Sequence, residues 1–298
     1  MSEPSHRAGY IAIAGRPNVG KSTLLNRLIG QKISITSRKP QTTRRNIIGI
    51  LTRPGAQLVF VDTPGFQTAR DSALSRLMNR SVLGGVQGVH VIVLVTEALK
   101  LQASEERLRA ALPAGVPVVA VVNKIDRVRA KGDLLPYMSR LDQRLQPSAI
   151  VPVSALKDSG IEQLIAVITG LLPEGAPLFD EDEITRSSER FLAAELIREK
   201  LFRALGDELP YAATVDITSF EMVGDLRRIH ADIIVNRESQ KPIVIGRKGE
   251  RLRSIATRAR GDMERLFGGK VFLDVWVKVR SGWADDERAL SRLGYDEG

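Results

Sequence analysis

The chain has 298 residues, roughly twice the length of a typical domain, so two domains are expected. With 43% hydrophobic and 27% charged residues it has the composition of a folded globular protein, which excludes a mainly disordered chain. The 44 Lys and Arg against 35 Asp and Glu give a net charge of +9, which predicts a polyanionic partner, either nucleic acid or an anionic membrane surface.

Cysteine is absent, which excludes disulfides, thiolate metal sites and a cysteine nucleophile, and only three histidines occur, which argues against a histidine metal centre. The first seven residues are polar and lack the apolar core of a signal peptide. No apolar run approaches the length of about 18 residues that a spanning helix needs. The sequence therefore predicts a cytoplasmic protein that contacts a membrane only peripherally, through its charge.

Residues 1–173 are expected to form an α/β domain, because short apolar runs alternate there with helical patterns such as 22–29, 104–112 and 161–172. Several runs are apolar without alternation, as expected of central strands that are covered on both faces. The domain should therefore hold a mostly parallel sheet with helices on both faces. The six runs are Tyr10–Ala14, Ile47–Leu51, Leu58–Val61, Val89–Val95, Val116–Val122 and Ile150–Val153.

The composition changes after Leu172, and residues 174–185 are expected to be a linker because they combine Pro and Gly with the acidic run Asp180–Glu183. Residues 186–298 then form the second predicted domain. A helical pattern at 185–205 comes first, and strands at 212–220 and 227–235 follow. A basic helical stretch and a last strand at 271–279 complete an α+β unit with a C-terminal tail.

A phosphate-binding loop is predicted at Gly15–Ser22, which matches G-x-x-x-x-G-K-[ST] between a strand and a helix. The glycines let backbone N–H groups surround phosphate oxygens at a helix N-terminus. Lys21 would reach the β- and γ-phosphates, and the Ser22 hydroxyl would ligate Mg²⁺. The residues expected at the phosphates are Gly15, Arg16, Pro17, Asn18, Val19, Gly20, Lys21, Ser22 and Thr23.

Two further segments are expected to meet the γ-phosphate. Asp62–Gly65 ends a strand about 40 residues after the phosphate loop, where Asp62 can hold Mg²⁺ through water and the Gly65 N–H can donate to the γ-phosphate. A capped turn is the alternative for this segment. Between the two loops lies Gln41–Arg44, in which a threonine can close over Mg²⁺ and phosphate, and a plain polar loop is the alternative there. The predicted metal ligands are Ser22, Asp62 and one of the two threonines, Thr42 or Thr43. The residues of the second segment that are expected to bind GTP are Asp62, Thr63, Pro64, Gly65 and Phe66.

Guanine is the predicted base. Asn123–Asp126 follows a strand, and the Asp126 carboxylate can accept paired hydrogen bonds from guanine N1–H and the exocyclic amine, a donor pair that adenine lacks. Lys124 can lie across the base, and Ser154 and Ala155 can bring a backbone N–H to guanine O6. All these loops follow strand ends, where open α/β sheets bind ligands.

Hydrolysis without a partner is expected to be slow. Many GTPases place Gln directly after the glycine of the Asp62–Gly65 motif to orient the attacking water, and Phe66 occupies that position here. A fast single-turnover rate for the isolated protein would contradict this hypothesis.

An RNA-binding loop is predicted at Gly246–Gly249, a G-x-x-G pattern typical of KH domains. Gly85–Gly88 fits the bare pattern equally well, but residues 241–260 hold seven Lys or Arg and one acid. A solvated helix face is the alternative explanation for that charge. The residues expected at RNA are Gly246, Arg247, Lys248, Gly249, Arg251 and Arg253.

Two tryptophans and a histidine of the second domain are also considered as functional residues. Trp276 and Trp283 are candidates for stacking on bases, although the alternating strand around Trp276 favours a core position for that residue. His230 lies in a predicted strand and is expected to be structural.

Taken together, Gly15–Ser22, Gln41–Arg44, Asp62–Gly65, Asn123–Asp126, Ser154–Leu156 and the KH loop resemble the bacterial Era family of GTPases, from about Tyr10 to Trp283. The resemblance implies an α/β P-loop GTPase domain followed by an α+β type II KH domain. It selects Thr43 over Thr42, and it implies catalytic roles for Lys21, Thr43 and Gly65.

The resemblance further implies GTP and GDP as ligands with Mg²⁺, and K⁺ held through Asn18. The implied partners are small-subunit (16S) ribosomal RNA near its 3′ end and the 30S subunit, whose maturation the protein would assist. A monomer in the cytoplasm with some peripheral inner-membrane contact is expected. Two alternatives stay open: a regulatory GTPase at the membrane surface, and an RNA-binding module in which GTP is purely structural.

Overall fold

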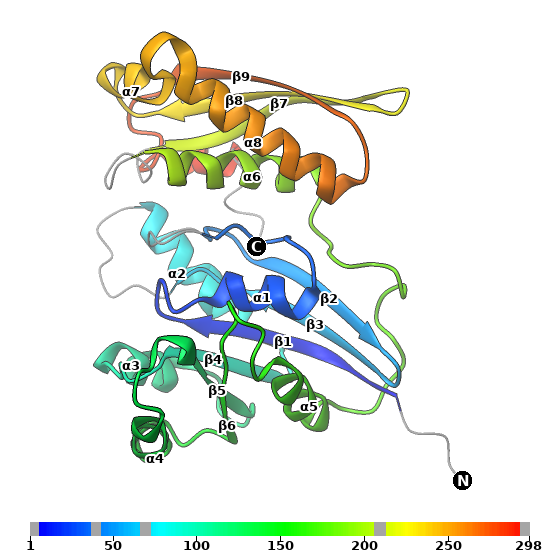
Figure 1. Ribbon diagram of the computed structural model, residues 1–298, viewed down its shortest axis with the longest axis vertical. Coiled ribbons are helices and arrows are strands. Elements are labelled where there is room, and N and C mark those ends of the chain that lie inside the picture. The colour runs from blue at the N-terminus through cyan, green and yellow to red at the C-terminus, as the bar shows by residue number, and fades with distance from the viewer. Residues whose placement is uncertain (1–5, 37–42, 66–72, 206–212, 293–298) are drawn as a thin grey trace.

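The computed structural model describes residues 6–36, 43–65, 73–205 and 213–292, and within them it contains two separate sheets (Figure 1). The first sheet has six strands in the order β2-β3-β1-β4-β5-β6. Neighbouring strands are parallel except for the β2–β3 hairpin, which confirms the predicted mostly parallel sheet. The strands are β1 (Arg7–Gly15), β2 (Ile47–Arg53), β3 (Ala56–Asp62), β4 (Val91–Glu97), β5 (Val118–Asn123) and β6 (Ala149–Pro152).

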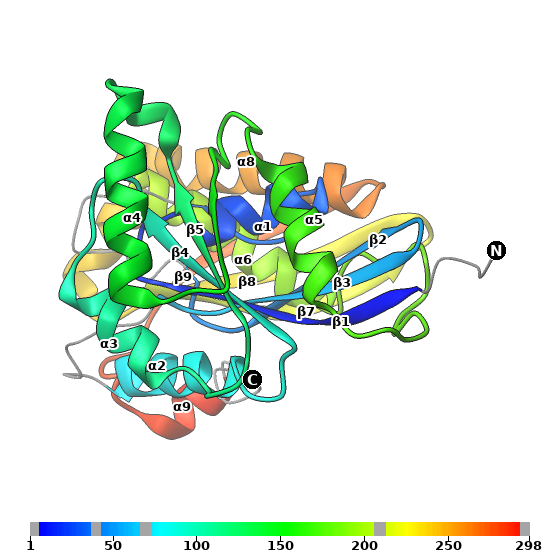
Figure 2. The same cartoon turned by 90° about the horizontal axis from the view of Figure 1, so that it is seen from below.

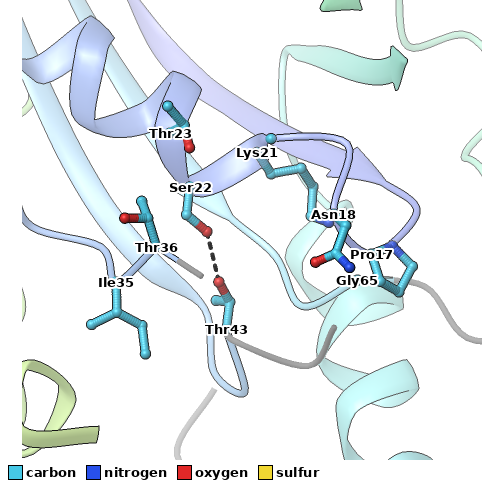
Figure 3. Close-up of a pocket in the computed structure, with 10 residues that line it drawn as sticks. Pro17, Asn18, Lys21, Ser22, Thr23, Ile35, Thr36, Thr43 and Gly65 are labelled. Atoms are coloured by element: carbon cyan, nitrogen blue, oxygen red, sulfur yellow. Dashed lines mark hydrogen bonds between the residues drawn. The ribbon is translucent and has the colours of Figure 1, made fainter. Parts of the chain in front are cut away.

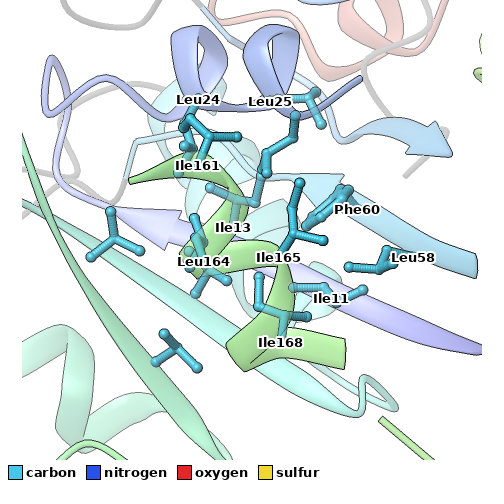
Figure 4. Packing of buried hydrophobic residues seen from close by; sticks show 14 of the residues in the cluster. Ile11, Ile13, Leu24, Leu25, Leu58, Phe60, Ile161, Leu164, Ile165 and Ile168 are labelled. Carbon is cyan, nitrogen blue, oxygen red and sulfur yellow. The ribbon is translucent and has the colours of Figure 1, made fainter. Parts of the chain in front are cut away.

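Helices cover both faces of this sheet because the central strands are apolar on both sides. Ile11 and Ile13 of β1 point to the face covered by α1 and α5, where they meet Leu24 and Ile165 (Figure 4). The alternate strand residues pack on the other side with α2, α3 and α4. The helices are α1 (Lys21–Ile29), α2 (Ala73–Gly85), α3 (Ala103–Ala111), α4 (Leu134–Leu145) and α5 (Ile161–Leu171).

The predicted linker contacts the first two strands of the sheet order, β3 and β2. The Gln57 side chain accepts hydrogen bonds from the N–H groups of Leu178 and Phe179, at 2.6 and 2.9 Å, and the Ile184 carbonyl accepts one from Ile50. The helical pattern predicted from residue 185 begins at Glu189 instead. Ser188 caps the helix by accepting the Phe191 N–H at 3.2 Å, whereas the Thr185 hydroxyl donates to the Ile48 carbonyl at 2.5 Å.

The second domain has the predicted α-β-β-α-α-β order of a KH domain. Its sheet order is β7-β8-β9, antiparallel for the first pair and parallel for the second. One sheet face packs on α6 and α8 through residues such as Ile233 and Ile255. The elements are α6 (Glu189–Ala204), β7 (Ala213–Val223), β8 (Leu226–Val235), α7 (Lys241–Ile245), α8 (Glu250–Phe267), β9 (Val271–Val279) and α9 (Glu287–Arg292), with 3₁₀ turns at Ile125–Arg127, Lys131–Asp133, Glu238–Gln240 and Arg247–Gly249.

Both tryptophan assignments need correction. Trp276 is 63% exposed, because β9 is an edge strand and the helices cover only the face that carries Val271 and Val277. The alternating pattern was correct, but Trp276 belongs to its outward half. Trp283 is only 1% exposed, so it is inaccessible to bases.

Residues 283–290 lie between the two domains. Trp283 and Leu290 are buried together with Ile234 of β8 and Met78 of α2, and Figure 2 shows α9 beside α2. Hydrophobic burial therefore joins the second domain to a helix of the first.

No helix in the described parts of the chain is long and apolar enough to cross a membrane.

Candidate nucleotide site and RNA-binding face

Four of the five sequence motifs of the first domain meet at one edge of its sheet, where the strands end. β1, β3 and β5 are held in one parallel sheet, and Gly15, Asp62 and Asn123 are their last residues. Ser154 follows β6 at the same edge. This is the edge where open α/β sheets bind ligands, so the chain order of the motifs becomes a spatial cluster.

The phosphate loop is fixed against the base-binding loop by Asn123. Its Nδ2 donates to the Val19 carbonyl at 2.9 Å, and its Oδ1 accepts from the Lys124 and Ala155 N–H groups at 2.8 and 3.1 Å. Gly20 has φ 104°, and a Cβ there would lie 2.3 Å from Asn123 Nδ2. Only glycine fits this close approach.

Lys21 is buried at the start of α1, and its Nζ donates to the carbonyls of Gly15 and Arg16, both at 3.0 Å. Burial lowers the pKa of Lys21 to about 8, against the opposing effect of Asp62. A cation held in a desolvated loop gains strongly from a nearby anion, because little water competes there. Figure 3 shows Lys21 in the pocket that Asn18, Ser22, Thr43 and Gly65 also line.

Three oxygen-bearing side chains form a cluster that fits Mg²⁺. Ser22 Oγ lies 2.8 Å from Thr43 Oγ1 (Figure 3). Ser22 Oγ also donates to Asp62 Oδ2 at 2.9 Å, and Ser34 Oγ donates to the same Oδ2 at 3.1 Å. Asp62 Oδ1 is buried and has no hydrogen-bond partner among the described residues. Burial raises the pKa of Asp62 to about 6. An unpartnered carboxylate oxygen beside two hydroxyls suits a hard cation with oxygen ligands.

The base-binding loop presents an exposed carboxylate. Asp126 Oδ1 accepts a hydrogen bond from Ser154 Oγ at 2.6 Å, which fixes the carboxylate while leaving Oδ2 available for a ligand. Lys124 has φ 66°, and its Nζ donates to the Asn18 carbonyl and to Glu97 Oε2, both at 2.6 Å. The Lys124 ammonium therefore connects this loop to the phosphate loop and to the end of β4.

Several predicted site residues have mainly structural contacts. The Val19 side chain is buried in the core, and the Thr63 N–H and hydroxyl both donate to the Ile13 carbonyl, at 3.2 and 2.9 Å. A Cβ on Gly65 would lie 2.9 Å from Pro17 Cα, so the Asp62–Gly65 segment closely approaches the phosphate loop. Thr42 and Phe66 lie outside the described residues.

Three residues that the sequence analysis did not identify make contacts to predicted nucleotide-site residues. Ser34 bonds Asp62, Glu97 pairs with Lys124, and the fully buried Glu105 pairs with Arg16. Glu105 also accepts the Gln102 N–H at 3.0 Å, which ties the phosphate loop to the start of α3. The bonds from Ser34 to Asp62, from Glu97 to Lys124 and from Glu105 to Arg16 join residues distant in sequence, so no local motif predicts them.

The predicted RNA loop joins α7 to α8 on the surface of the second domain. Gly246 has φ 75°, and a Cβ there would lie 2.7 Å from Arg251 Cβ. Arg247, Lys248 and Arg253 are exposed and have no ion pair with described residues. The Arg251 guanidinium donates to the Ile243 carbonyl at the edge of the loop. Exposed cations around a glycine-bearing turn can pair with phosphates.

The structure shows which isoleucines near the Gly246–Gly249 loop are exposed, and it shows where the second G-x-x-G pattern, Gly85–Gly88, lies. Ile255 is buried in the core, Ile245 is half-buried and Ile243 is 46% exposed, so only Ile243 projects substantially into solvent. Gly85 ends α2 in the first domain, with its Cα beside Thr63 and Asn46. The Gly85–Gly88 pattern therefore belongs to a helix end within the first domain.

Comparisons with known proteins follow the same two-domain division. Residues 10–124 match the family described as 50S ribosome-binding GTPase, and residues 208–284 match the KH domain family. The protein GTPase Era of Nitrosomonas eutropha is 55% identical over 296 residues, 99% of this chain and 100% of that protein. GTPase Era of Chromobacterium violaceum is 51% identical over the same shares of both chains.

Solved structures extend the likeness to the whole fold. A variant of Era from Aquifex aeolicus bound to GDP and AlF4⁻ has a TM-score of 0.94 at 37% identity, covering 97% of this chain and 99% of that one. Era in complex with MgGDPNP and nucleotides 1506–1542 of 16S ribosomal RNA has a TM-score of 0.93 with the same identity and coverage. The chain matches these proteins over nearly its whole length, and it belongs to the Era family of GTPases.

Proposed function

We propose that this protein is a GTP-hydrolysing switch that binds 16S ribosomal RNA near its 3′ end through the KH domain and assists maturation of the 30S subunit. The observation that carries the proposal is the oxygen cluster of Ser22, Thr43 and Asp62 beside Lys21, in a chain that also presents an exposed basic G-x-x-G loop. The Era complex with MgGDPNP and 16S RNA supports the pairing of these two ligands.

In the proposed reaction, water attacks the γ-phosphorus in line, and the bond to the β–γ bridging oxygen breaks to give GDP and phosphate. Lys21 leaves the carbonyls of Gly15 and Arg16 and donates to β- and γ-phosphate oxygens. Ser22, Thr43 and Asp62 would hold Mg²⁺, and the bound ion would neutralise phosphate charge. The Gly65 N–H donates to the γ-phosphate. Because Phe66 cannot orient water, slow intrinsic hydrolysis remains a prediction.

Replacing Asp126 by Asn is expected to lower GTP affinity about a hundredfold, because the amide offers donors where guanine also presents donors. Affinity for XTP should rise, since xanthine carries a carbonyl where guanine carries its amine. The amide oxygen can still accept the Ser154 hydrogen bond, so the loop should keep its shape. Competition of GTP and XTP against a fluorescent guanine nucleotide measures both effects. Retention of GTP preference by Asp126→Asn would contradict the assignment, and the exposed Asp133→Asn serves as control.

Acid is expected to weaken the Mg²⁺-dependent part of nucleotide binding. The pKa of Asp62 is raised to about 6, and its proton must leave before the carboxylate can hold a cation. Affinity should therefore fall by up to about tenfold for each pH unit below that value. Titrations from pH 7 to pH 5, with Mg²⁺ and with EDTA, separate the metal contribution. An Asp62→Asn variant should bind weakly and show little of this pH dependence; a slope equal to that of the unaltered protein would contradict the role of Asp62.

We also propose that the protein is a cytoplasmic monomer, and that K⁺ binds through Asn18, as the resemblance to Era implies. Asn18 is one of the residues that line the pocket. Its φ is 63°, and its carbonyl accepts a hydrogen bond from Lys124 Nζ. Equal GTPase rates in K⁺ and Na⁺ would count against the K⁺ site. Peripheral inner-membrane contact would use the basic surface around Gly246–Gly249 that is also expected to bind RNA. RNA should therefore displace the protein from anionic vesicles.

Binding of a synthetic RNA with the 3′-terminal 16S sequence, measured together with GTP turnover, tests the whole proposal. Saturable RNA binding at physiological salt and Mg²⁺-dependent phosphate release are the expected results. Lipid binding that RNA cannot displace would favour the membrane-surface GTPase. RNA binding with no turnover, even in the presence of ribosomal subunits, would favour the alternative in which GTP is structural.

A further inference from the structure

Thr43 and Arg44 are consecutive residues whose side chains contact different domains: Thr43 contacts the nucleotide site, and Arg44 contacts the second domain. Thr43 is buried, and its Oγ1 lies 2.8 Å from Ser22 Oγ in the oxygen cluster of the nucleotide site. Consecutive Cα atoms are about 3.8 Å apart across a trans peptide. A displacement of one residue therefore moves the other.

Arg44 is 2% exposed and inserts into a socket formed by Ala213, Phe202 and Trp283. Its Nη1 donates to the Ala213 carbonyl at 3.1 Å, and its guanidinium lies 5.7 Å from the ring centroids of both Phe202 and Trp283. All three socket residues belong to the second domain. A buried guanidinium needs such hydrogen-bonding and aromatic partners to offset the loss of its hydration.

The Arg44 socket is itself held in place. Phe202 is fully buried in α6, and Trp283 packs with Ile234, Leu290 and Met78 in the cluster between the domains. Such packing leaves few alternative positions for the aromatic rings. Arg44 is therefore anchored to a fixed part of the second domain.

The segment that follows α1 is also tied to the second domain. Arg203 of α6 donates to the Thr36 carbonyl and hydroxyl at 3.2 and 3.0 Å. Lys32 pairs with Glu199 of α6 at 2.7 Å and with Asp262 of α8 at 2.6 Å. The described residues on both sides of positions 37–42 thus contact the second domain.

We propose that Arg44 is a positioning residue for the GTPase site: anchored in its socket, it holds Thr43 where the hydroxyl can complete the Mg²⁺ ligands beside the γ-phosphate. The inference rests on the proposed function. In GTPases this segment is ordered by the γ-phosphate and its Mg²⁺ and is released on hydrolysis. The anchor therefore favours GTP over GDP, and the second domain contributes to nucleotide selectivity without touching the nucleotide.

The coupling must act in both directions. If the anchored position of Arg44 strengthens GTP binding, then GTP strengthens the anchor by the same factor. Couplings of this kind typically change affinity by about 5-fold to 150-fold. Loss of the anchor should consequently lower affinity for GTP selectively.

The experiment uses the full chain, a fluorescent non-hydrolysable GTP analogue and fluorescent GDP, each with Mg²⁺ and with EDTA. Arg44→Ala is expected to bind the GTP analogue about tenfold more weakly in Mg²⁺, while GDP affinity stays within about twofold. In EDTA the variant and the unaltered protein should bind the analogue alike, because Thr43 acts through the metal. Arg44→Lys, which keeps a cation and a donor for Ala213, should give an intermediate value.

Two further variants separate positioning from general loss of structure. Trp283→Phe alters the socket from the second domain and should weaken GTP-analogue binding with the same selectivity. Arg227→Ala removes an arginine that stacks on Phe267 and pairs with Glu189 within the second domain, and it should leave the GTP-to-GDP affinity ratio unchanged. Unchanged analogue binding by Arg44→Ala, or an equal loss for both nucleotides, would overturn the inference. Failure of the unaltered chain to bind either nucleotide would instead remove the proposed function, and this inference with it.

Discussion

Lys21→Ala is expected to lower kcat/KM for GTP by about a thousandfold, a loss of about 4 kcal/mol of transition-state stabilisation. The Lys21 ammonium is a buried cation beside the oxygen cluster, and this burial lowers its pKa to about 8. Its charge is therefore poorly screened and acts strongly on developing phosphate charge. Single-turnover phosphate release at saturating and limiting GTP measures the change.

The same substitution should not destabilise the fold. Burial lowers the pKa of Lys21 to about 8, so its charged form is less favourable in the folded chain than in the unfolded chain, although the charge is kept at neutral pH. The melting temperature of Lys21→Ala should thus equal or exceed that of the unaltered protein, as expected when a functional residue carries a stability cost. Lys131→Ala removes an exposed lysine and is the matched control. Near-normal turnover in Lys21→Ala would refute the role of Lys21 in phosphate binding.

Reversing the two charges at the centre of the G-x-x-G loop, with Arg247→Asp and Lys248→Asp together, is expected to reduce affinity for the 16S 3′-end RNA about a hundredfold or more. Both side chains are exposed, so their loss should cost little stability. GTP binding and turnover without RNA should be unchanged. Fluorescence anisotropy with labelled RNA over a range of salt concentrations measures the affinity and its salt dependence.

A matched variant controls for net charge in this experiment. Arg129→Asp with Lys131→Asp makes the same charge change at exposed positions of the first domain. If RNA is held at the predicted loop, this variant should lose far less affinity, because only charges near the phosphates release counterions on binding. An equal loss in both double variants would show that general charge, rather than the Gly246–Gly249 loop, holds the RNA.

Much of the first domain could be predicted from the sequence, because its signals are local. Val118–Val122 is apolar on both faces and therefore had to be a covered strand, and the phosphate loop lies where its strand–helix context requires. Parallel strands then bring Asp62 and Asn123 to the same edge as Gly15. Correct motif spacing was sufficient for this part of the site.

The remaining features depend on contacts between distant segments. Trp276 lies on the outer side of β9, and only the packing of α6 and α8 reveals which side that is. Ser34 and Glu105 lie far in sequence from Asp62 and Arg16, which they bond. Arg44 belongs to a recognised motif, yet its role in joining the domains depends on Trp283, 239 residues later in the chain.

The account's central claim is that the nucleotide site and the RNA-binding domain form one coupled switch. The most direct measurement is the Kd of the unaltered full chain for the 16S 3′-end RNA, determined once with a non-hydrolysable GTP analogue and Mg²⁺ and once with GDP and Mg²⁺. Because Thr43 and Arg44 link the oxygen cluster to the socket in the second domain, RNA should bind about tenfold more tightly in the GTP-analogue state. Equal Kd values in the two states would contradict the claim.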